Sequence, residues 1–581
     1  MHLTLPYIKR FTLLLLVVIA GNYLASLKVF QLDLTGDQRH TLHRETVKWI
    51  QSQKEPVLAE VLFAGDFPSG YKRLQESTID FLKKCRNINP SIRYVVKDPM
   101  EGNEEEVNER ITAFSKMGMI PLPVRFESGT EFIVKQAFPY VVLTKGAKRV
   151  IITLTEGLTA GPYNEEKLNE AVAILEYKFA NAFQKLMQEE RKKIAFHTGR
   201  GELSRQKTFR LEQELSKFYQ VGRFSLDTVP LINPGIDLIF FAGPVESFSE
   251  RDLFAIDRYI MEGGKIIWLL NPVRVSMDSI AKNDPFVPIP LELGLENLFF
   301  KYGVRMNPDL VLDMESAQIP LVTGMIGGEP QIDLYPWYFY PLVRGNKEHP
   351  INAAVEPLLM RFPSSIDTVK TDGQVFKDIV LASSNRSRIQ TLPSQVSLEM
   401  VRFPVPEDRF NHRQVPLAVL SEGFFPSLFA NRLTSSYTQM LMDYGLEAKS
   451  IGDYAIQLFV SDARLILSEL NPATGELFPI GYHREERKIF SGNKEWILNA
   501  VEYMMGNGPI LYLKNKKVSL RLFNAERLNA ERNWWQWFNT VLPLVLLTIC
   551  GVIYHWVRKR KYSQPIKMGQ KEIATYSERN L

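Results

Sequence analysis

The chain has 581 residues and a formal net charge of +5, which is too small over this length to indicate nucleic-acid binding. Its two cysteines, Cys85 and Cys550, cannot form the disulfide framework that holds small secreted domains together. The chain is marked instead by two strongly apolar stretches near its ends, separated by a long segment of ordinary globular composition.

The first apolar stretch, residues 11–27, is about long enough to cross the roughly 30 Å hydrocarbon core of a bilayer as a helix. Residues 1–10 include Lys9 and Arg10, and positive residues beside a span favour the cytoplasmic side. A cleaved signal peptide over residues 1–26 is the competing interpretation. We expect an uncleaved transmembrane helix with a cytoplasmic N-terminus, because the apolar run is longer than usual and ends without a good cleavage site.

Residues 28–190 alternate between strand and amphipathic-helix patterns after a polar lead-in, in which Thr41 is a candidate N-cap. The expected elements are strands at 57–64 and 92–97, helices at 69–85 and 104–117, strands at 132–144 and 148–153, and a helix at 164–187. This β-α-β-α-β-β-α order predicts a thioredoxin-like domain. The segment lacks a C-x-x-C pair, so we expect a scaffold or binding domain, with Cys85 buried on a helix face.

Residues 191–510 predict a second α/β unit, in which continuous apolar strands alternate with helices, as in a parallel sheet covered on both faces. The early elements are strands at 194–196, 237–241 and 265–270 and helices at 208–218 and from Ser249 to the stop at Gly263-Gly264. We expect the unit to resume late, with a strand at 463–468 and a helix at 494–505. The Pro-rich stretch at about 275–450 is expected to hold insertions and a further small α/β region around 378–383 and 415–421.

Ligands of open α/β sheets bind at the carboxyl ends of the strands, where the loops at 197–202, 242–246 and 271–274 qualify. The first loop supplies the candidate ligand-binding residues His197, Arg200, Gly201 and Glu202. Glycines let the backbone approach a ligand, and the charged groups are suited to binding an anion or moving a proton. In the alternative interpretation, the glycines only shape a turn and the charged groups are solvated.

Several kinds of active site are missing from the sequence. Neither the G-x-S-x-G elbow of a serine nucleophile nor the G-x-x-x-x-G-K-[ST] loop that binds ATP phosphates is present. His349, His412 and His483 are isolated, without a partner at metal-ligand spacing. We therefore expect no catalytic residue, no metal and no cofactor.

A juxtamembrane segment at 511–537 leads to the second apolar stretch, residues 538–557, which is followed by a tail at 558–581. Aromatic residues that suit the two membrane interfaces bracket this span: Trp534, Trp535, Trp537 and Trp556. The tail opens with a positive cluster that favours the cytoplasm: Arg558, Lys559, Arg560 and Lys561. The expected topology is two-pass, with both termini cytoplasmic and the body periplasmic.

Short stretches typical of one family are spread over nearly the whole chain. They are Asp33-Leu34-Thr35, Arg39-His40-Thr41-Leu42, Phe67-Pro68-Ser69-Gly70-Tyr71-Lys72-Arg73-Leu74, Leu175-Glu176-Tyr177-Lys178-Phe179-Ala180-Asn181-Ala182, Gly199-Arg200-Gly201-Glu202-Leu203, Lys301-Tyr302-Gly303-Val304, Pro416-Leu417-Ala418-Val419-Leu420, Glu422-Gly423, Gly492-Asn493-Lys494, Leu498-Asn499-Ala500, Arg521-Leu522 and the run 558–562. By their order and spacing, and by its two terminal apolar segments, the chain resembles the GldG-type auxiliary component of ABC transporters, in the branch associated with bacterial gliding motility.

The resemblance implies partners rather than a reaction: an ABC permease and an ABC ATPase, in an assembly linked to gliding and surface-protein secretion. It also implies that residues 191–510 form a glutamine-amidotransferase-like α/β domain without the catalytic cysteine. The chain departs from the family pattern at Arg200, where His is usual, and at residues 468–471, where a Gly-Asp-type turn is usual. Because both departures lie in strand-end loops, we transfer no catalytic residue.

The leading prediction is a non-enzymatic component of an ABC-type transporter in the inner membrane, with its spans against the permease and lipid and its body bound to a substrate or an envelope partner. One alternative is a structural adaptor that links a motility or secretion machine to the membrane without transport. The other is a glycan-modifying enzyme, for which Glu202 with His197 is the only acid/base candidate. The sequence leaves open whether the body pairs with itself.

Overall fold

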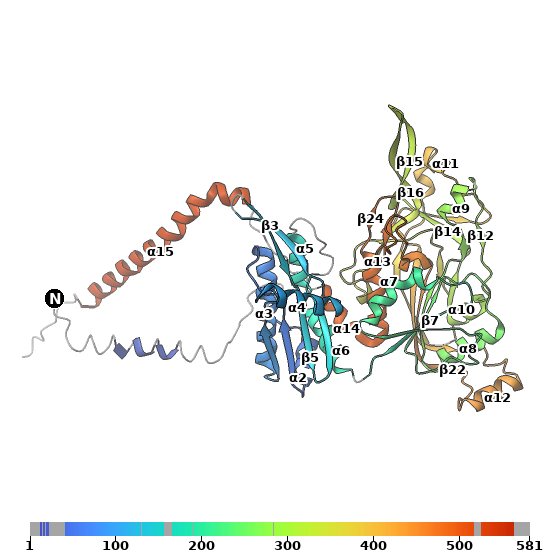
Figure 1. Cartoon of the computed structure of the whole chain (residues 1–581), viewed down its shortest axis with the longest axis horizontal. Coiled ribbons are helices and arrows are strands. Elements are labelled where there is room, and N and C mark those ends of the chain that lie inside the picture. Colours follow the sequence, from blue (N-terminus) through green and yellow to red (C-terminus); the bar gives the residue numbers. More distant parts are fainter. Residues whose placement is uncertain are drawn as a thin grey trace, which may run out of the picture. The chain divides into compact units, whose positions relative to one another are not determined.

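The computed structural model describes residues 41–128, 131–155, 165–188, 190–282, 284–372, 374–515 and 525–562, together with a few residues between positions 12 and 21. The chain divides into two units, one that ends at Val518 and one that begins at Ser519. Figure 1 shows the sheets and helices of the first unit, which is called the body below, and the long helix α15 (Ala525–Tyr562) of the second.

The first part of the body contains a four-stranded sheet in the order β2-β1-β5-β6. β1 (Val57–Val61) and β2 (Ile92–Val96) are parallel, whereas β5 (Tyr140–Lys145) runs antiparallel to β1 and to β6 (Lys148–Thr153). Successive side chains of a strand point to opposite faces, so this sheet contributes to two cores. The larger core involves α2 (Arg44–Ser52), α3 (Ser69–Ile88), α5 (Glu165–Ala173) and α6 (Leu175–Met187), and the smaller core lies under α4 (Glu104–Lys116).

Two expectations for this part, a helix cap and a strand, are wrong. Thr41 is not the N-cap of α2, because His43 takes that place and its Nδ1 accepts from Glu45 N at 3.3 Å. The single strand expected at 132–144 is two strands, β4 (Glu131–Ala137) and β5, because Pro139 between them has no N–H to continue a ladder. β4 forms a hairpin with β3 (Leu122–Ser128), which the sequence pattern did not reveal.

The long helix expected at 164–187 is also divided, into α5 and α6, with Ile174 between them at φ −94° and ψ 5°. Cys85 is buried on α3, as its place on the apolar face predicts. The thioredoxin-like assignment of this part remains a prediction.

A larger, mixed sheet forms the second part of the body. Its parallel strands are β7 (Lys193–His197), β8 (Gln220–Phe224), β9 (Leu238–Ala242), β10 (Lys265–Leu269) and β22 (Ile451–Val460). They lie side by side in the order β8-β7-β9-β10-β22, with every neighbouring pair parallel. Numbered along the chain, this is the 2-1-3-4-5 order of a doubly wound sheet. The more specific amidotransferase-like assignment remains a prediction.

The segments expected to form a separate small α/β region instead extend this sheet. β21 (Pro416–Pro426) pairs antiparallel with β22, and β19 (Gln374–Ala382) pairs antiparallel with β21. The strand expected at 463–468 is also wrong: residues 463–466 form a short 3-10 helix, and β22 ends before it at Val460. Asp462 caps that turn by accepting from Arg464 N at 2.8 Å, which explains why an apolar run does not continue as a strand.

Helices cover both faces of the parallel strands, as continuous apolar strands predict. α7 (Arg205–Ser216) and α13 (Gly492–Glu502) pack on one face, and α8 (Glu250–Met261) and α10 (Glu296–Tyr302) on the other. The capping box expected at Ser249 is present at the start of α8. The helix expected at 494–505 ends earlier, since a π-turn at Tyr503–Asn507, with Gly506 at φ +87°, leads into α14 (Gly508–Leu511).

A long hairpin of β15 (Ser316–Ile326) and β16 (Glu329–Gly345) forms the outer end of the sheet and projects from it (Figure 1). The remaining short elements are β11 (Val273–Arg274), α9 (Met277–Lys282), β12 (Ile289–Pro290), β13 (Val304–Met306), β14 (Asp309–Asp313), β17 (Leu358–Leu359), β18 (Ile366–Thr368), β20 (Ser387–Thr391), α11 (Glu399–Arg402), α12 (Ser435–Asp443), β23 (Tyr482–His483) and β24 (Lys488–Ile489).

Among the described residues, one helix is long and apolar enough to cross a membrane, Ala530–Tyr562, which forms most of α15 and includes the expected span at 538–557. Pro543 lies inside this helix. The expected first span at 11–27 and its flanking residues Lys9 and Arg10 lie largely outside the described residues.

Candidate functional site

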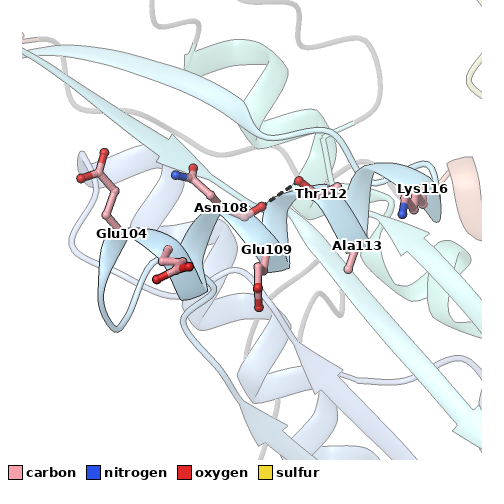
Figure 2. A pocket seen from close by; sticks show the side chains of 7 residues that line it. Glu104, Asn108, Glu109, Thr112, Ala113 and Lys116 are labelled. Carbon is pink, nitrogen blue, oxygen red and sulfur yellow. Dashed lines mark hydrogen bonds between the residues drawn. The ribbon is translucent and has the colours of Figure 1, made fainter.

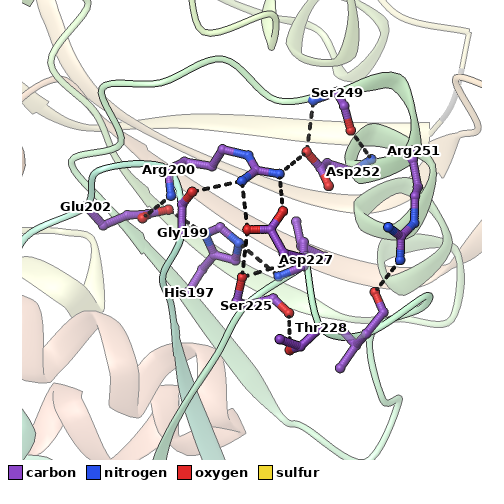
Figure 3. A network of polar contacts seen from close by, with 12 residues as sticks. His197, Gly199, Arg200, Glu202, Ser225, Asp227, Thr228, Ser249, Arg251 and Asp252 are labelled. Carbon is purple, nitrogen blue, oxygen red and sulfur yellow. Dashed lines mark hydrogen bonds and ion pairs between the residues drawn. The ribbon is translucent and has the colours of Figure 1, made fainter.

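The strand order places a topological switch point between β7 and β9, because the chain passes from β7 to β8 on one side and then to β9 on the other. Open α/β sheets bind their ligands in the crevice at such a point, outside the carboxyl ends of the strands. His197 is the last residue of β7, and Gly243 directly follows β9. The loop singled out from the sequence therefore lies where this kind of sheet places a binding site, and Figure 3 shows its polar contacts.

His197 is fully buried and both of its ring nitrogens are engaged. Nδ1 contacts the carboxylate of Glu202, and Nε2 accepts from Leu226 N at 3.4 Å. Since a backbone N–H only donates, the proton of the neutral imidazole lies on Nδ1 and is donated to Glu202. Glu202 also accepts from Arg200 N at 2.8 Å. Burial raises the pKa of Glu202, but the hydrogen bonds that its carboxylate accepts from His197 and from the backbone N–H of Arg200 outweigh burial and leave the pKa lowered.

Arg200 binds two carboxylates from neighbouring segments (Figure 3). Its guanidinium lies 2.7 and 3.1 Å from the two oxygens of Asp227, after β8, and 2.8 Å from Oδ2 of Asp252, in the first turn of α8. The hydrogen bond to Asp227, followed by that to Asp252, raises the pKa of Arg200. Burial raises the pKa of Asp252, and the hydrogen bonds from Arg200 and Ser249 more than reverse this. Asp252 closes the capping box as well, so this ion pair joins the β7 loop, the β8 loop and the start of α8.

The two glycines of the loop bring it close to other parts of the protein. Gly199 has φ +113°, and a Cβ there would lie 2.7 Å from the hydroxyl of Ser225. Gly201 has φ +73°, and a Cβ there would lie 2.4 Å from a methyl group of Val245. Side chains of the protein thus fill the space beside both glycines that a ligand would need. Ligand binding at His197, Arg200, Gly201 and Glu202 stays a prediction, and this geometry favours the turn interpretation.

Two hollows of the body lie away from the switch point. One, of about 830 Å³, is lined by residues of α4 alone, and Figure 2 shows Glu104, Asn108, Glu109 and their neighbours projecting from the exposed side of that helix. A hollow bounded by one helix is an open surface that cannot enclose a ligand. The other, of about 120 Å³, lies at the amino ends of the strands beside Asp237, Tyr259 and Lys265.

A second ionic network, which the sequence did not reveal, follows the carboxyl end of β22. Asp462 accepts from Arg361 N at 2.6 Å and from Arg464 N at 2.8 Å, while the Arg361 guanidinium lies 2.8 Å from Glu469. Ala463 N donates to Asn271 at the end of β10, at 3.0 Å. Residues far apart in the chain meet here, so sequence spacing carried no signal. Residues 468–471, where the chain departs from the family pattern, include Glu469, which pairs with Arg361.

Each of the three histidines expected to be isolated, His349, His412 and His483, contacts other groups of the protein. His349 accepts from Ile351 N at 3.3 Å, and the backbone of His412 bridges to Ser387. His483 is buried 3.3 Å from a carboxylate oxygen of Glu485, and burial lowers its pKa to about 4. No group of three or more metal-ligating side chains occurs within the described parts of the chain.

The membrane-related residues near the C-terminus lie on α15. The aromatic residues Trp534, Trp535, Trp537 and Trp556 are exposed on this helix, and the positive cluster Arg558, Lys559, Arg560 and Lys561 lies in its last turns. The Arg560 guanidinium lies 3.9 Å from the centre of the Trp556 ring. The length, composition and basic end of α15 indicate membrane association.

Comparison with known proteins places most of the second part of the body in a family. Residues 191–500, more than half of the chain, match the family model described as "ABC-type uncharacterized transport system". The chain belongs to this family of ABC transport auxiliary proteins. The match does not distinguish the GldG-type branch from the rest of the family. Residues 36–144 separately match a domain family of unknown function.

Two individual similar proteins give less information about the family than the family model does. An uncharacterized protein of Borreliella burgdorferi strain B31 is 21% identical over 548 residues, which cover 92% of this chain and 95% of the relative. A structure titled "mmIFT52 N-terminal domain" matches 54% of this chain and 97% of its own, at 14% identity and a TM-score of 0.30. That TM-score is too low to carry an argument.

Proposed function

We propose that this auxiliary protein is non-enzymatic, and that it connects a body outside the membrane to an ABC permease and its ATPase. The observation that carries the proposal is the closed state of the switch point. His197, Arg200 and Glu202 are all bound to protein groups, and protein side chains lie against both glycines. Enzymes keep acids, bases and nucleophiles exposed to substrate in a cleft, which this arrangement does not provide.

The same contacts suit a mechanical role. Ion pairs tie the loops after β7 and β8 to α8, and the second network ties the end of β22 to Asn271. We infer that these contacts keep the second part of the body in one piece, which would let a displacement of that part at one side reach its other side. Family membership supplies the transporter context, because auxiliary components act with the other subunits of an ABC system.

We further propose that both ends of the chain are anchored. α15 ends in Arg558–Lys561, and the apolar residues 11–27 follow Lys9 and Arg10. Positive residues stay on the cytoplasmic side, so both termini would lie in the cytoplasm and the body in the periplasm. Two anchors restrict the orientation of the body, which one anchor would leave free.

The test is affinity purification of the tagged full-length protein from gently solubilised membranes, with quantitative mass spectrometry and an ATPase assay. We expect a polytopic permease and an ABC ATPase in stoichiometric yield, and an ATPase rate that changes when this protein is removed from the complex. Recovery of envelope or motility proteins without either transporter subunit would instead support the structural adaptor.

The GldG resemblance adds a link to gliding motility and surface-protein secretion. Deleting the gene and restoring the full-length chain tests this part separately, by surface translocation of single cells and by the amount of surface-exposed protein. Normal translocation and secretion in the deletion strain would limit the function to transport. The glycan-modifying alternative requires that Glu202→Gln abolish function while the protein stays folded.

A further inference from the structure

One corner of the large sheet carries aromatic side chains that no helix of the described residues covers. Cross-strand pairing aligns Gln374 of β19 with Phe424 of β21 and Tyr454 of β22, and two residues along β19, on the same face, it aligns Phe376 with Glu422. Phe376, Phe424 and Tyr454 are 74%, 43% and 50% exposed. These three aromatic residues and Glu422 are called the aromatic corner below. Exposed apolar clusters of this kind mark interaction surfaces.

Glu422 gives this surface a negative centre. Both of its carboxylate oxygens accept from the hydroxyl of Tyr503 at 3.3 Å, and Tyr503 borders the corner at the end of α13. Glu422 forms no ion pair with a cation in the part of the chain that the structure describes. Asp378, two residues beyond Phe376 on β19, is exposed and adds a second negative group. A carboxylate among aromatic rings favours a cationic side chain, which gains from the carboxylate and from the ring faces.

The neighbouring edge of β19 is open. β16 pairs with β19 only at Leu381 and Ala382, so residues 374–379 have a strand neighbour on the β21 side alone within the described chain. Edge strands are often protected by an outward lysine. Here Lys377 does not do so, because its ammonium group donates to Val369 O at 2.7 Å. An extended peptide can therefore pair its main chain with this edge, as in β-augmentation.

We propose that the open edge of β19 and the aromatic corner together bind an extended segment of a second protein, in which a lysine or arginine is flanked by apolar residues. The main chain of the segment would pair with residues 374–379. Alternate side chains would then lie on the aromatic rings, and the cation would reach Glu422. The proposal does not depend on the transporter assignment.

The charge of the corner selects this occupant over two others. A second copy of the chain that paired through the same edge would bring Glu422 and Asp378 towards their own counterparts, and like charges oppose such pairing. An anionic lipid surface would also be repelled by these carboxylates. A basic segment compensates both groups.

The experiment uses the full-length protein in its native membrane, with the photoreactive amino acid p-benzoylphenylalanine in place of Phe376. The matched control carries it in place of Phe403, which is 76% exposed and lies outside the corner. We expect a cross-link to another protein at position 376 only, mapped to a segment with a lysine or arginine between apolar residues. Glu422→Lys should lower the yield about tenfold, and Glu422→Gln should lower it less because it removes the charge without reversing it.

Five results would overturn the proposal. Four concern the adduct: equal cross-linking at both positions, no protein adduct at position 376, an adduct with a second copy of the chain, and a mapped segment without a basic residue. An unchanged yield in both Glu422 variants, at wild-type thermal stability, would also overturn it. Since Glu422→Gln keeps an acceptor for Tyr503, loss of binding in that variant separates charge recognition from misfolding.

Discussion

At the scale of single residues, the molecule is marked by charges that are buried and paired within the strand-end loops. Arg200 is the clearest case, because one guanidinium satisfies the exposed Asp227 and the buried Asp252. Removing one partner of a buried pair is costly because the other charge stays desolvated. We therefore expect Arg200 to stabilise the body by holding these loops together, and this contribution to stability can be measured.

We predict that Arg200→Met destabilises the body by about 3 kcal/mol, since Asp252 keeps its burial and loses its cation. Arg200→Lys should recover only part of this, because an ammonium group lacks the fork that binds two carboxylates. Thermal and denaturant unfolding of the purified full-length protein measures both. The control is Arg386→Met, which removes an exposed pair with Glu407 and should change stability by less than about 0.5 kcal/mol. Equal effects of the two methionine variants would mean that the Arg200 network is structurally unimportant.

The lowered pKa of Glu202 predicts that the stability of the folded protein depends on pH. Its pKa in the folded protein is lowered, so it contributes stability above the unfolded pKa of about 4.3, and this stability is lost as the pH falls through the folded value. The difference in stability between wild type and Glu202→Gln should be largest near neutral pH and should shrink below about pH 4. Unfolding measured from pH 7 to pH 3 checks this, with exposed Glu246 changed to Gln as the control. A difference that stays constant over this range would show that charge is not what Glu202 contributes.

At the scale of elements, local pattern predicted most of the helices and parallel strands, and pairing between distant segments was the part it missed. The capping box at Ser249 and the stop at Gly263-Gly264 gave the correct bounds of α8, because caps are local chemistry. The sequence pattern predicted regular structure where β19 and β21 lie. It did not predict that these strands pair with β22 and extend the large sheet. The partners of Arg200 were missed for the same reason, since Asp227 and Asp252 lie 27 and 52 residues away.

The contact of α6 with the C-terminal end of α13 is a second such case. Lys185 of α6 lies 2.7 Å from Glu502, with both side chains almost fully buried, and its ammonium group lies 3.5 Å from the centre of the Phe218 ring. Burial raises the pKa of Glu502, and Lys185 more than reverses this. Within the described residues, the ammonium group of this lysine, from the first part of the body, is paired with the carboxylate of Glu502.

We predict that Lys185→Met weakens this contact by about 3 kcal/mol, because Glu502 is left buried without a cation. Amide hydrogen exchange should speed up by about a hundredfold in α6 and in residues 492–511, and should change little in β7 and β9. The double variant Lys185→Met with Glu502→Gln should recover most of the protection, since it removes the charge as well. Faster exchange spread evenly over both sheets would indicate global destabilisation instead.

At the scale of the whole molecule, family membership and α15 constrain the function more than any single side chain does. The family match covers the α/β sheet whose switch point is closed, and α15 carries an apolar span that ends in four basic residues. A closed site on an anchored body fits a protein that acts through its partners. The proposed topology is the step on which this argument depends, because the body can meet an envelope partner only from the outer side.

We predict that a cysteine on the body is reached from outside the inner membrane and one in the C-terminal tail is not. Cys550→Ser provides the background, because Cys85 is buried and burial raises its pKa well above the usual range. In cells with a permeabilised outer membrane, an impermeant maleimide should label Lys116→Cys on exposed α4. It should label Ser577→Cys only after the inner membrane is lysed. Labelling of Ser577→Cys in intact spheroplasts, with Lys116→Cys protected, would place the body in the cytoplasm and exclude an envelope partner on the opposite side.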